Sequence, residues 1–277
     1  MTLIAGVEET DDPAQTGETL ARLMREHPSR AIVLRLRSGD AAYLSSRVFA
    51  QCWMPFGHRR QICCEQVELT ATAASLPDLP AVVLPLAIPD LPVMLWCRSA
   101  ALFAQPAFGA LALMADKTIV DSAGFGLPAL RAFARKHRTA DLAWTRLTRW
   151  RELIAQIFEN RAYLADLPRL TTIRVTHEGE QPTVSALYMG AWLKRCLPAA
   201  ALRLERGPAS SVSLEMAGET HTGIRISGET GVDVQVRGHK THTVFPAADD
   251  YALLREELSI PGRDPVFESI LFSEDLP

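Results

Sequence analysis

The alternation of strand-like and helix-like apolar segments constrains the first part of this chain more than any other feature. Residues 30–36 (RAIVLRL), 92–98 (PVMLWCR) and 117–122 (KTIVDS) are typical of buried strands, and helical patterns separate or follow them at 79–87, 108–114 and 127–137. Strands that alternate with helices of this length form mostly parallel or mixed sheets with helices on both faces. We therefore expect an α/β fold.

The hydrophobic period changes in the C-terminal part of the chain. Apolar residues there alternate with polar ones, as at Val212, Leu214 and Met216, and Gly-containing turns separate the segments. A period of two with such turns is typical of antiparallel strands. We expect an α/β domain at residues 1–168 and a smaller α+β domain with a β-rich antiparallel meander at residues 169–277.

Capping and turn signals predict further elements. Asp12 can cap a helix whose first position is Pro13, and this helix is the first element that we expect. Two β-rich segments, 43–53 and 61–71, flank the sequence MPFGHRR at 54–60, which predicts a hairpin. Further helices are expected at 141–158, 183–196 and 249–258.

Charge and hydropathy exclude two classes of partner. The formal net charge of the 277 residues is −3, so the chain has no overall basic field that would hold nucleic acid. The longest apolar run, from Leu79 to Cys97, is interrupted by four prolines and contains Asp90. A membrane helix would not tolerate this pattern, so we expect no membrane association.

Cysteine usage and the first residues favour a cytoplasmic location. The five cysteines have no CxxC spacing, and the sequence MTLIAGVEET lacks the basic start and apolar run of a signal peptide. We expect a reducing, cytoplasmic environment.

The segment DLAWTRLTRWRELIAQIFEN at 141–160 combines two tryptophans with three arginines. On a helical projection Trp150 lies on a broad apolar face and Arg149 lies opposite, in solvent. Arg146 and Arg151 leave the backbone from the apolar side, so each guanidinium needs a partner or a path to water.

Two interpretations of this segment stay open. Its arginines could bind internal acids such as Asp90 or Asp121 within a core helix. Alternatively, Trp144, Arg146, Trp150 and Arg151 could form a protein-binding surface, because tryptophan and arginine dominate such interfaces. A DNA-binding helix fits worst, because the arginines do not share one exposed face.

The loop after residues 117–120 is a candidate ligand site. Asp121 and Ser122 follow the predicted strand, and Gly124 and Gly126 precede a helix that contains Pro128. Ligands, including phosphates, bind at such strand ends in open α/β sheets. The loop matches neither a Walker motif nor GxGxxG, and glycine is also the ordinary solution to a tight turn.

Other polar residues give weaker signals. Glu65 shares a strand face with buried positions, so Glu65 and Asp90 are candidate buried acids. His239 and His242 would lie on opposite strand faces, which makes them poor metal co-ligands. With no recognisable catalytic motif, we expect a protein that is not an enzyme and holds no metal or cofactor.

Five segments resemble the OpcA family, the glucose-6-phosphate dehydrogenase assembly proteins, between about Pro28 and Cys196. They are, in order, CCEQVEL, PLAIPDLPVMLW, KTIVDS, DLAWTRLTRWRELIAQIF and SALYMGAWL. Family patterns often have a second tryptophan where this chain has Cys97. The resemblance implies a non-catalytic, cytoplasmic factor that binds glucose-6-phosphate dehydrogenase, promotes its active oligomer and supports NADPH production. Self-association stays open, and the alternative is a sugar-phosphate- or nucleotide-binding protein or enzyme with a site at Asp121–Gly126.

Overall fold

The computed structural model describes residues 1–53, 62–216, 224–228, 231–246, 248–260 and 262–276, with the side chains of 51–53 and 62–64 left aside. The predicted hairpin turn at 54–60 lies outside the described residues. The chain forms two compact units: residues 1–142 with 249–263, and residues 143–248 with 264–277. The expected division into domains at residues 1–168 and 169–277 stays a prediction.

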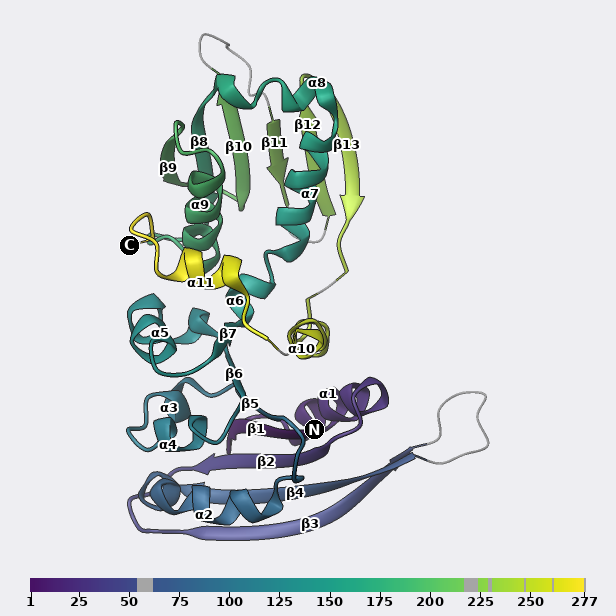
Figure 1. Ribbon diagram of the computed structural model, residues 1–277, viewed down its shortest axis with the longest axis vertical. Helices are drawn as coiled ribbons and strands as arrows, with labels where there is room; N and C mark the ends of the chain where they lie inside the picture. Colours follow the sequence, from purple (N-terminus) through teal and green to yellow (C-terminus); the bar gives the residue numbers. More distant parts are fainter. Residues whose placement is uncertain (54–61, 217–223, 229–230, 247, 261, 277) are drawn as a thin grey trace. The chain divides into compact units, whose positions relative to one another are not determined.

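The first unit is built on a seven-stranded sheet with the order β3-β4-β2-β1-β5-β6-β7 (Figure 1). Neighbouring strands are parallel except for the antiparallel pair β3 and β4. This confirms the predicted mostly parallel sheet. The strands are β1 (Thr2–Glu8), β2 (Arg30–Arg37), β3 (Leu44–Trp53), β4 (Ile62–Thr72), β5 (Val93–Cys97), β6 (Lys117–Val120) and β7 (Thr139–Asp141).

The central strand β1 was not predicted, and the first expected element was a helix. Thr2 to Val7 are all buried, and β1 pairs with both β2 and β5. A parallel strand that is covered on both faces is apolar throughout and lacks the alternation that marks a half-exposed strand. The segment TLIAGV therefore carries no periodic signal.

The helix α1 (Pro13–Glu26) confirms the predicted cap, because the Asp12 carboxylate accepts a hydrogen bond from Ala14 N at 2.9 Å. The predicted apolar stretch from Leu79 forms a helix, a turn and the strand β5. The other helices of the first unit are α2 (Leu79–Val83), α3 (Ala100–Phe103), α4 (Phe108–Ala112), α5 (Leu127–Ala134), α10 (Asp250–Ser259) and the 3-10 helices η1 (Ala73–Asp78), η2 (Leu84–Leu86) and η3 (Ser122–Gly124). No helix within the described ranges is long and apolar enough to cross a bilayer.

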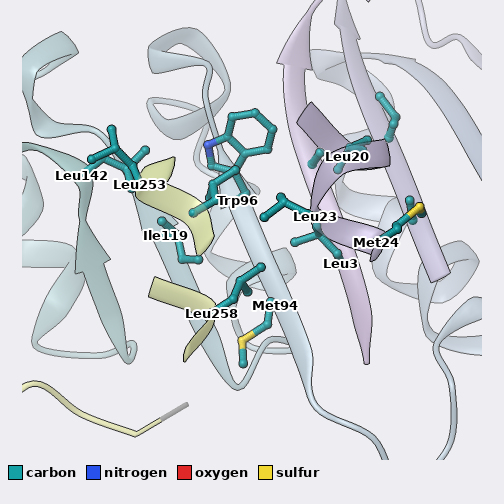
Figure 2. Packing of buried hydrophobic residues seen from close by; sticks show 14 of the residues in the cluster. Leu3, Leu20, Leu23, Met24, Met94, Trp96, Ile119, Leu142, Leu253 and Leu258 are labelled. Carbon is teal, nitrogen blue, oxygen red and sulfur yellow. The ribbon is translucent and has the colours of Figure 1, made fainter. Parts of the chain in front are cut away.

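One hydrophobic cluster joins α1 and α10 to the sheet (Figure 2). Leu20 and Leu23 of α1 and Leu258 of α10 pack in the same cluster as Trp96 of β5. The cluster also contains Leu3 of β1, and its members are at most 6% exposed. The returning segment 249–263 is thus part of the first unit's core.

The second unit is built on a six-stranded sheet with the order β13-β12-β11-β10-β8-β9. The strands β10 to β13 form the predicted antiparallel meander, whereas β9 pairs parallel to β8 through α9 (Val184–Cys196). A Cβ on Gly190 of α9 would lie 3.2 Å from Leu202 and Leu204, so this glycine permits close helix–sheet packing. The strands are β8 (Leu170–His177), β9 (Ala201–Arg206), β10 (Ser211–Met216), β11 (Ile224–Ser227), β12 (Gly231–Val236) and β13 (His239–Val244).

The long helix predicted at 141–158 is divided in two. The helix α6 (Leu142–Thr145) ends before Arg146, and α7 (Thr148–Glu159) begins after Leu147. After α10 the chain forms a further helix, α11 (Pro265–Leu271), and the remaining helices are α8 (Arg161–Leu164) and the 3-10 helix η4 (Leu167–Arg169).

Candidate functional site

The carboxyl edge of the seven-stranded sheet is where an α/β protein of this topology would bind a ligand. The chain runs from β1 to β2 on one side and from β5 to β7 on the other, so the strand order reverses between β1 and β5. Ligands of open α/β sheets occupy the crevice at such a reversal, and phosphates bind there at a helix N-terminus.

In this chain the edge between β1 and β5 is acidic and has no glycine. The segment EETDD follows Val7 and supplies the carboxylates of Glu8, Glu9, Asp11 and Asp12. Asp12 already caps α1, and Pro13 at the first helical position has no N–H to donate. A phosphate at this helix end would meet carboxylates in place of donors.

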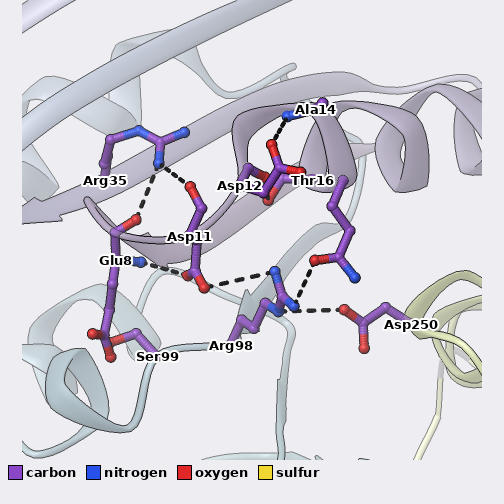
Figure 3. A network of polar contacts seen from close by, with 10 residues as sticks. Glu8, Asp11, Asp12, Ala14, Thr16, Arg35, Arg98, Ser99 and Asp250 are labelled. Carbon is purple, nitrogen blue, oxygen red and sulfur yellow. Dashed lines mark hydrogen bonds and ion pairs between the residues drawn. The ribbon is translucent and has the colours of Figure 1, made fainter.

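Arg98 and Arg35 organise these acidic groups into one network (Figure 3). The Arg98 guanidinium pairs with Asp11 at 3.7 Å and with Asp250 at 3.3 Å. Arg35 donates to the carbonyls of Glu8 and Asp11 at 3.0 and 3.3 Å. The Ser99 hydroxyl donates to the Glu8 carboxylate at 2.8 Å. These groups at the edge are therefore hydrogen-bonded or ion-paired with one another.

The predicted ligand loop holds the ends of β6 and β7 together. Ser122 is fully buried; its N–H donates to the carboxylate of Asp141 at 3.0 Å, and its hydroxyl donates to the same carboxylate. The Asp121 carboxylate accepts from Ala123 N at 3.2 Å. Binding of a ligand by Asp121, Ser122, Gly124 and Gly126 stays a prediction.

The two glycines of this loop have different roles. Gly126 has a φ of +85°, a conformation that side chains disfavour. A Cβ on Gly124 would meet Ala100 at 3.5 Å, an ordinary contact. Phe125 between them stacks on Phe103 at 3.9 Å. Only Gly126 is required by the backbone.

The segment at 141–160 builds an aromatic cluster in the second unit. Trp144 is 2% exposed, and its indole Nε1 donates to the carboxylate of Asp264 at 3.0 Å. Its ring contacts Tyr188 of α9 and Phe267 of α11, with centroids 5.7 and 6.0 Å away. Such contacts among aromatic rings add to the energy of burial.

Arg151 joins this cluster from α7. Its guanidinium carbon lies 3.6 Å from the centroid of the Trp144 ring, and its Nη2 donates to the Thr148 hydroxyl at 2.9 Å. The prediction that Arg151 leaves its helix among apolar groups is confirmed. Cation–π stacking on Trp144 and the hydrogen bond to Thr148 stabilise the guanidinium at that position.

The rest of α7 is less covered than the projection suggested. Ile154 is buried, but Trp150 and Leu153 are only half-buried. Arg149 is exposed, as predicted, and pairs with Glu152 at 3.3 Å. A groove of about 290 Å³ lies beside the edge strand β13, with Leu153, Val244 and Phe245 among its lining residues. Arg146 is half-buried at the break between the two helices.

The prediction of buried acids is wrong at Glu65 and Asp90. The Glu65 side chain is 55% exposed and pairs with Arg30 at 3.3 Å. In the parallel pair of β4 and β2, Gln66 lies opposite Ala31. Glu65, one residue earlier, therefore lies level with the first residue of β2. Asp90 is exposed, with a φ of 60°, in the turn before β5.

His239 and His242 lie on opposite faces of β13, as predicted. His239 pairs in register with Val236, whereas His242 pairs with Asp233 and its Nδ1 lies 2.8 Å from the Asp233 carboxylate. Within the described residues, no three His, Cys, Asp or Glu side chains gather as a metal site.

Two family models together cover most of the chain. One, described as the glucose-6-phosphate dehydrogenase subunit N-terminal domain, matches residues 21–135, and the other, described as the C-terminal domain of the same subunit, matches residues 137–271. The chain belongs to the OpcA family. The predicted resemblance is therefore confirmed, and it extends beyond Cys196 into the β-rich part.

Curated OpcA relatives are longer than the matched segment. A protein of Nostoc punctiforme that bears the name OxPP cycle protein OpcA is 30% identical over 176 residues, which cover 60% of this chain and 37% of the relative. Its namesake in Synechocystis sp. is 27% identical, with 59% and 36% covered. The matched segment thus spans less than two fifths of these relatives.

Likeness to solved structures is low. A Gfo/Idh/MocA family oxidoreductase from Vibrio cholerae aligns with 97% of this chain and 93% of its own length, with a TM-score of 0.37 and 9% identity. This likeness supports no statement about the OpcA-family chain.

Two residues of the polar contacts described above, Asp141 and Asp264, were not predicted as site residues from the sequence. The Asp264 carboxylate binds Trp144 and also caps α11, accepting from Val266 N and Phe267 N at 2.9 and 3.0 Å. The pair Asp264–Pro265 is a recognisable helix start, so a signal for α11 existed. Nothing in the sequence links Asp264 to Trp144 or Asp141 to Ser122.

Proposed function

We propose that this chain is a non-catalytic cytoplasmic subunit that binds glucose-6-phosphate dehydrogenase and favours its active oligomer, thereby supporting NADPH production in the oxidative pentose phosphate pathway. The observation that carries the proposal is the match of both dehydrogenase-subunit family models, over residues 21–135 and 137–271. The names of the relatives, which refer to the OxPP cycle, agree with it.

The carboxyl edge of the first sheet supports the absence of a catalytic role. A nucleotide or sugar phosphate needs donors and positive charge at the strand-order reversal. Here Glu8 and Asp11 lie at that position, and Arg98 is already paired with Asp11 and Asp250. This geometry favours a protein that acts by binding.

The mechanism is linkage. A subunit that binds the active assembly of its partner more tightly than the inactive one shifts the equilibrium by that difference in affinity. A difference of about 2 kcal/mol changes the equilibrium roughly thirtyfold. No reacting group is required.

Reconstitution with the cognate dehydrogenase tests the proposal. NADPH formation and sedimentation should be measured for the dehydrogenase alone and with added chain, at several salt concentrations. We expect a higher rate and a larger assembly in the mixture, and no NADPH from the chain alone. An unchanged rate and size across physiological salt would contradict the proposal.

Substitutions test whether Trp144, Arg146, Trp150 and Arg151 contact the partner. The burial of Trp144 supports a structural role, whereas the half-buried Trp150 is open to contact. We expect Trp150→Ala to reduce the stimulation of the dehydrogenase while Arg149→Ala retains it. If Trp150→Ala unfolds the chain, its role is in the core.

The alternative function is tested by ligand screening. A ligand that binds only the folded state raises the unfolding temperature. If the chain acts only by binding its protein partner, sugar phosphates and nucleotides should leave its unfolding temperature unchanged. Stabilisation that Asp121→Ala abolishes would favour a small-molecule site at the Asp121–Gly126 loop.

A further inference from the structure

The six-stranded sheet of the second unit has one face covered by helices. Gly190 of α9 packs against Leu202 and Leu204 of β9, and the groove beside α7 is lined by Thr243 of β13. Pairing in register across the sheet places these strand residues on the same face. Residues between them in sequence project from the opposite face.

That opposite face is polar and is exposed towards both ends of the strand order, whereas Ser211 and Ser213 of the inner strand β10 are each 6% exposed. Asp233 and His242 project from it, and their side chains are 78% and 60% exposed. Arg203, Arg225 and Lys240 on the same face are also exposed. The described helices thus leave this surface available.

The strand register aligns the basic residues of this face in a single row. Directly opposed residues link the six strands from β9 to β13 in five pairing steps, and we call them the basic row: Arg203, Arg174, Ser213, Arg225, Gln235 and Lys240. At about 4.8 Å per strand the row is roughly 24 Å long. Four of its six members are cations and none is acidic.

Most of this positive charge is not neutralised internally. Arg174 pairs with Glu205 and Glu215, each at 3.1 Å. Arg203, Arg225 and Lys240 make no ion pair with any residue that the structure describes. Three exposed cations on a rigid sheet therefore remain available to an external anion.

The surroundings of the row favour a protein surface over nucleic acid. Two residues along the strands, the next row of the same face contains Glu205 and Asp233. These carboxylates border the cations at roughly 7 Å, given a rise of about 3.4 Å per residue. A polyphosphate would meet both signs of charge, and the net charge of −3 also opposes it.

We propose that the basic row is the docking surface for a carboxylate-bearing surface of the protein partner. The proposal rests on the proposed function, in which that partner is glucose-6-phosphate dehydrogenase. Charge complementarity across an interface steers association and fixes register, and the rigid spacing of the row supplies both. The row would thus determine where the subunit binds.

Single charge reversals test the proposal in the full chain. Arg225→Glu and Lys240→Glu each change the net charge by two, and so does the control Arg195→Glu, at an exposed cation near the end of α9. The Kd for the purified dehydrogenase should be measured at low and physiological salt, with thermal unfolding as a check of folding. We expect each reversal in the row to weaken binding about tenfold at low salt, and less at higher salt, while the control binds like the wild type.

The outcomes separate the two proposals. If the wild type binds and both reversals in the row bind equally well, the docking surface is overturned and the proposed function stands. If the wild type does not bind the dehydrogenase, both are overturned. Two other results would overturn the assignment of this surface to the dehydrogenase. One is that the wild type binds duplex DNA and Arg225→Glu abolishes this binding. The other is that the chain forms dimers and Arg225→Glu abolishes them. Arg225→Lys, which keeps the charge, should retain binding and guards against a folding artefact.

Discussion

The guanidinium of Arg151 lies 3.6 Å from the centre of the Trp144 ring, across the break between α6 and α7. The contact fixes the direction in which α7 leaves the break, because Trp144 is itself held by Asp264, Tyr188 and Phe267. The segment DLAWTRLTRWRELIAQIF, one of the five that carry the family resemblance, therefore supports the packing of the second unit.

Replacement of Arg151 should destabilise the protein. Arg151→Ala removes the stacking on Trp144 and the hydrogen bond to Thr148, so we expect the free energy of unfolding to fall by about 1–3 kcal/mol. Urea denaturation measures the change. Arg149→Ala, at an exposed position, should stay within about 0.5 kcal/mol of the wild type. Equal effects of the two variants would contradict a structural role for the stack.

Replacement of Lys117 should separate α10 from the sheet. Its ammonium lies 2.7 Å from the Glu257 carboxylate and donates to the carbonyls of Glu257 and Ile260, and the two side chains are only 4% and 9% exposed. Lys117→Met leaves Glu257 buried without this partner, so we expect a loss of about 3–5 kcal/mol. Proteolysis and urea denaturation would detect it. An exposed pair such as Arg149–Glu152 contributes at most about 1 kcal/mol. A loss no larger than this in Lys117→Met would show that the Lys117–Glu257 pair adds little to the free energy of unfolding.

The loop at 121–126 provides a matched pair of glycine substitutions. Gly126→Ala forces a side chain into a φ of +85°, so we expect a loss of about 1–2 kcal/mol. Gly124→Ala makes only ordinary contact and should be neutral. Differential scanning calorimetry of both variants measures the difference. Equal unfolding temperatures would contradict the assigned roles.

His137 should make stability depend on pH. Burial, and then the charge of Lys136, lower the pKa of His137, which stacks on Phe133 at 4.4 Å. The unfolded chain then binds more protons than the folded chain between the two pKa values. The contribution is fully present above the unfolded pKa of about 6.5 and is lost as the pH falls towards the lower folded pKa. Urea midpoints between pH 5 and 8 should fall less steeply with acid in His137→Gln, and identical profiles would refute this role.

Local patterns in the sequence were enough to predict the class of fold. The alternation of strands and helices predicted the mostly parallel sheet, and the change to a period of two predicted the meander from β10 to β13. The cap at Asp12 and the opposed faces of His239 and His242 also follow from local rules, and the structure confirms them. The family resemblance came from short motifs in a fixed order.

Local patterns failed where burial is complete or contact is distant. The strand β1 has no alternation because both of its faces are covered, and Glu65 was mistaken for a buried acid because its exposure depends on where β2 begins. The partners of Trp144 and Ser122 lie 120 and 19 residues away.

The sequence by itself determined most element types, which depend on neighbouring residues, the overall charge, which depends on composition, and the family, which depends on motifs in a fixed order. Only the tertiary structure decided that Asp264 holds Trp144, that α10 returns to the first unit, and that cations from four strands form one row. These facts depend on strand register and long-range packing. A shift of one residue in register would send each side chain to the other face, and no local pattern encodes which strands become neighbours.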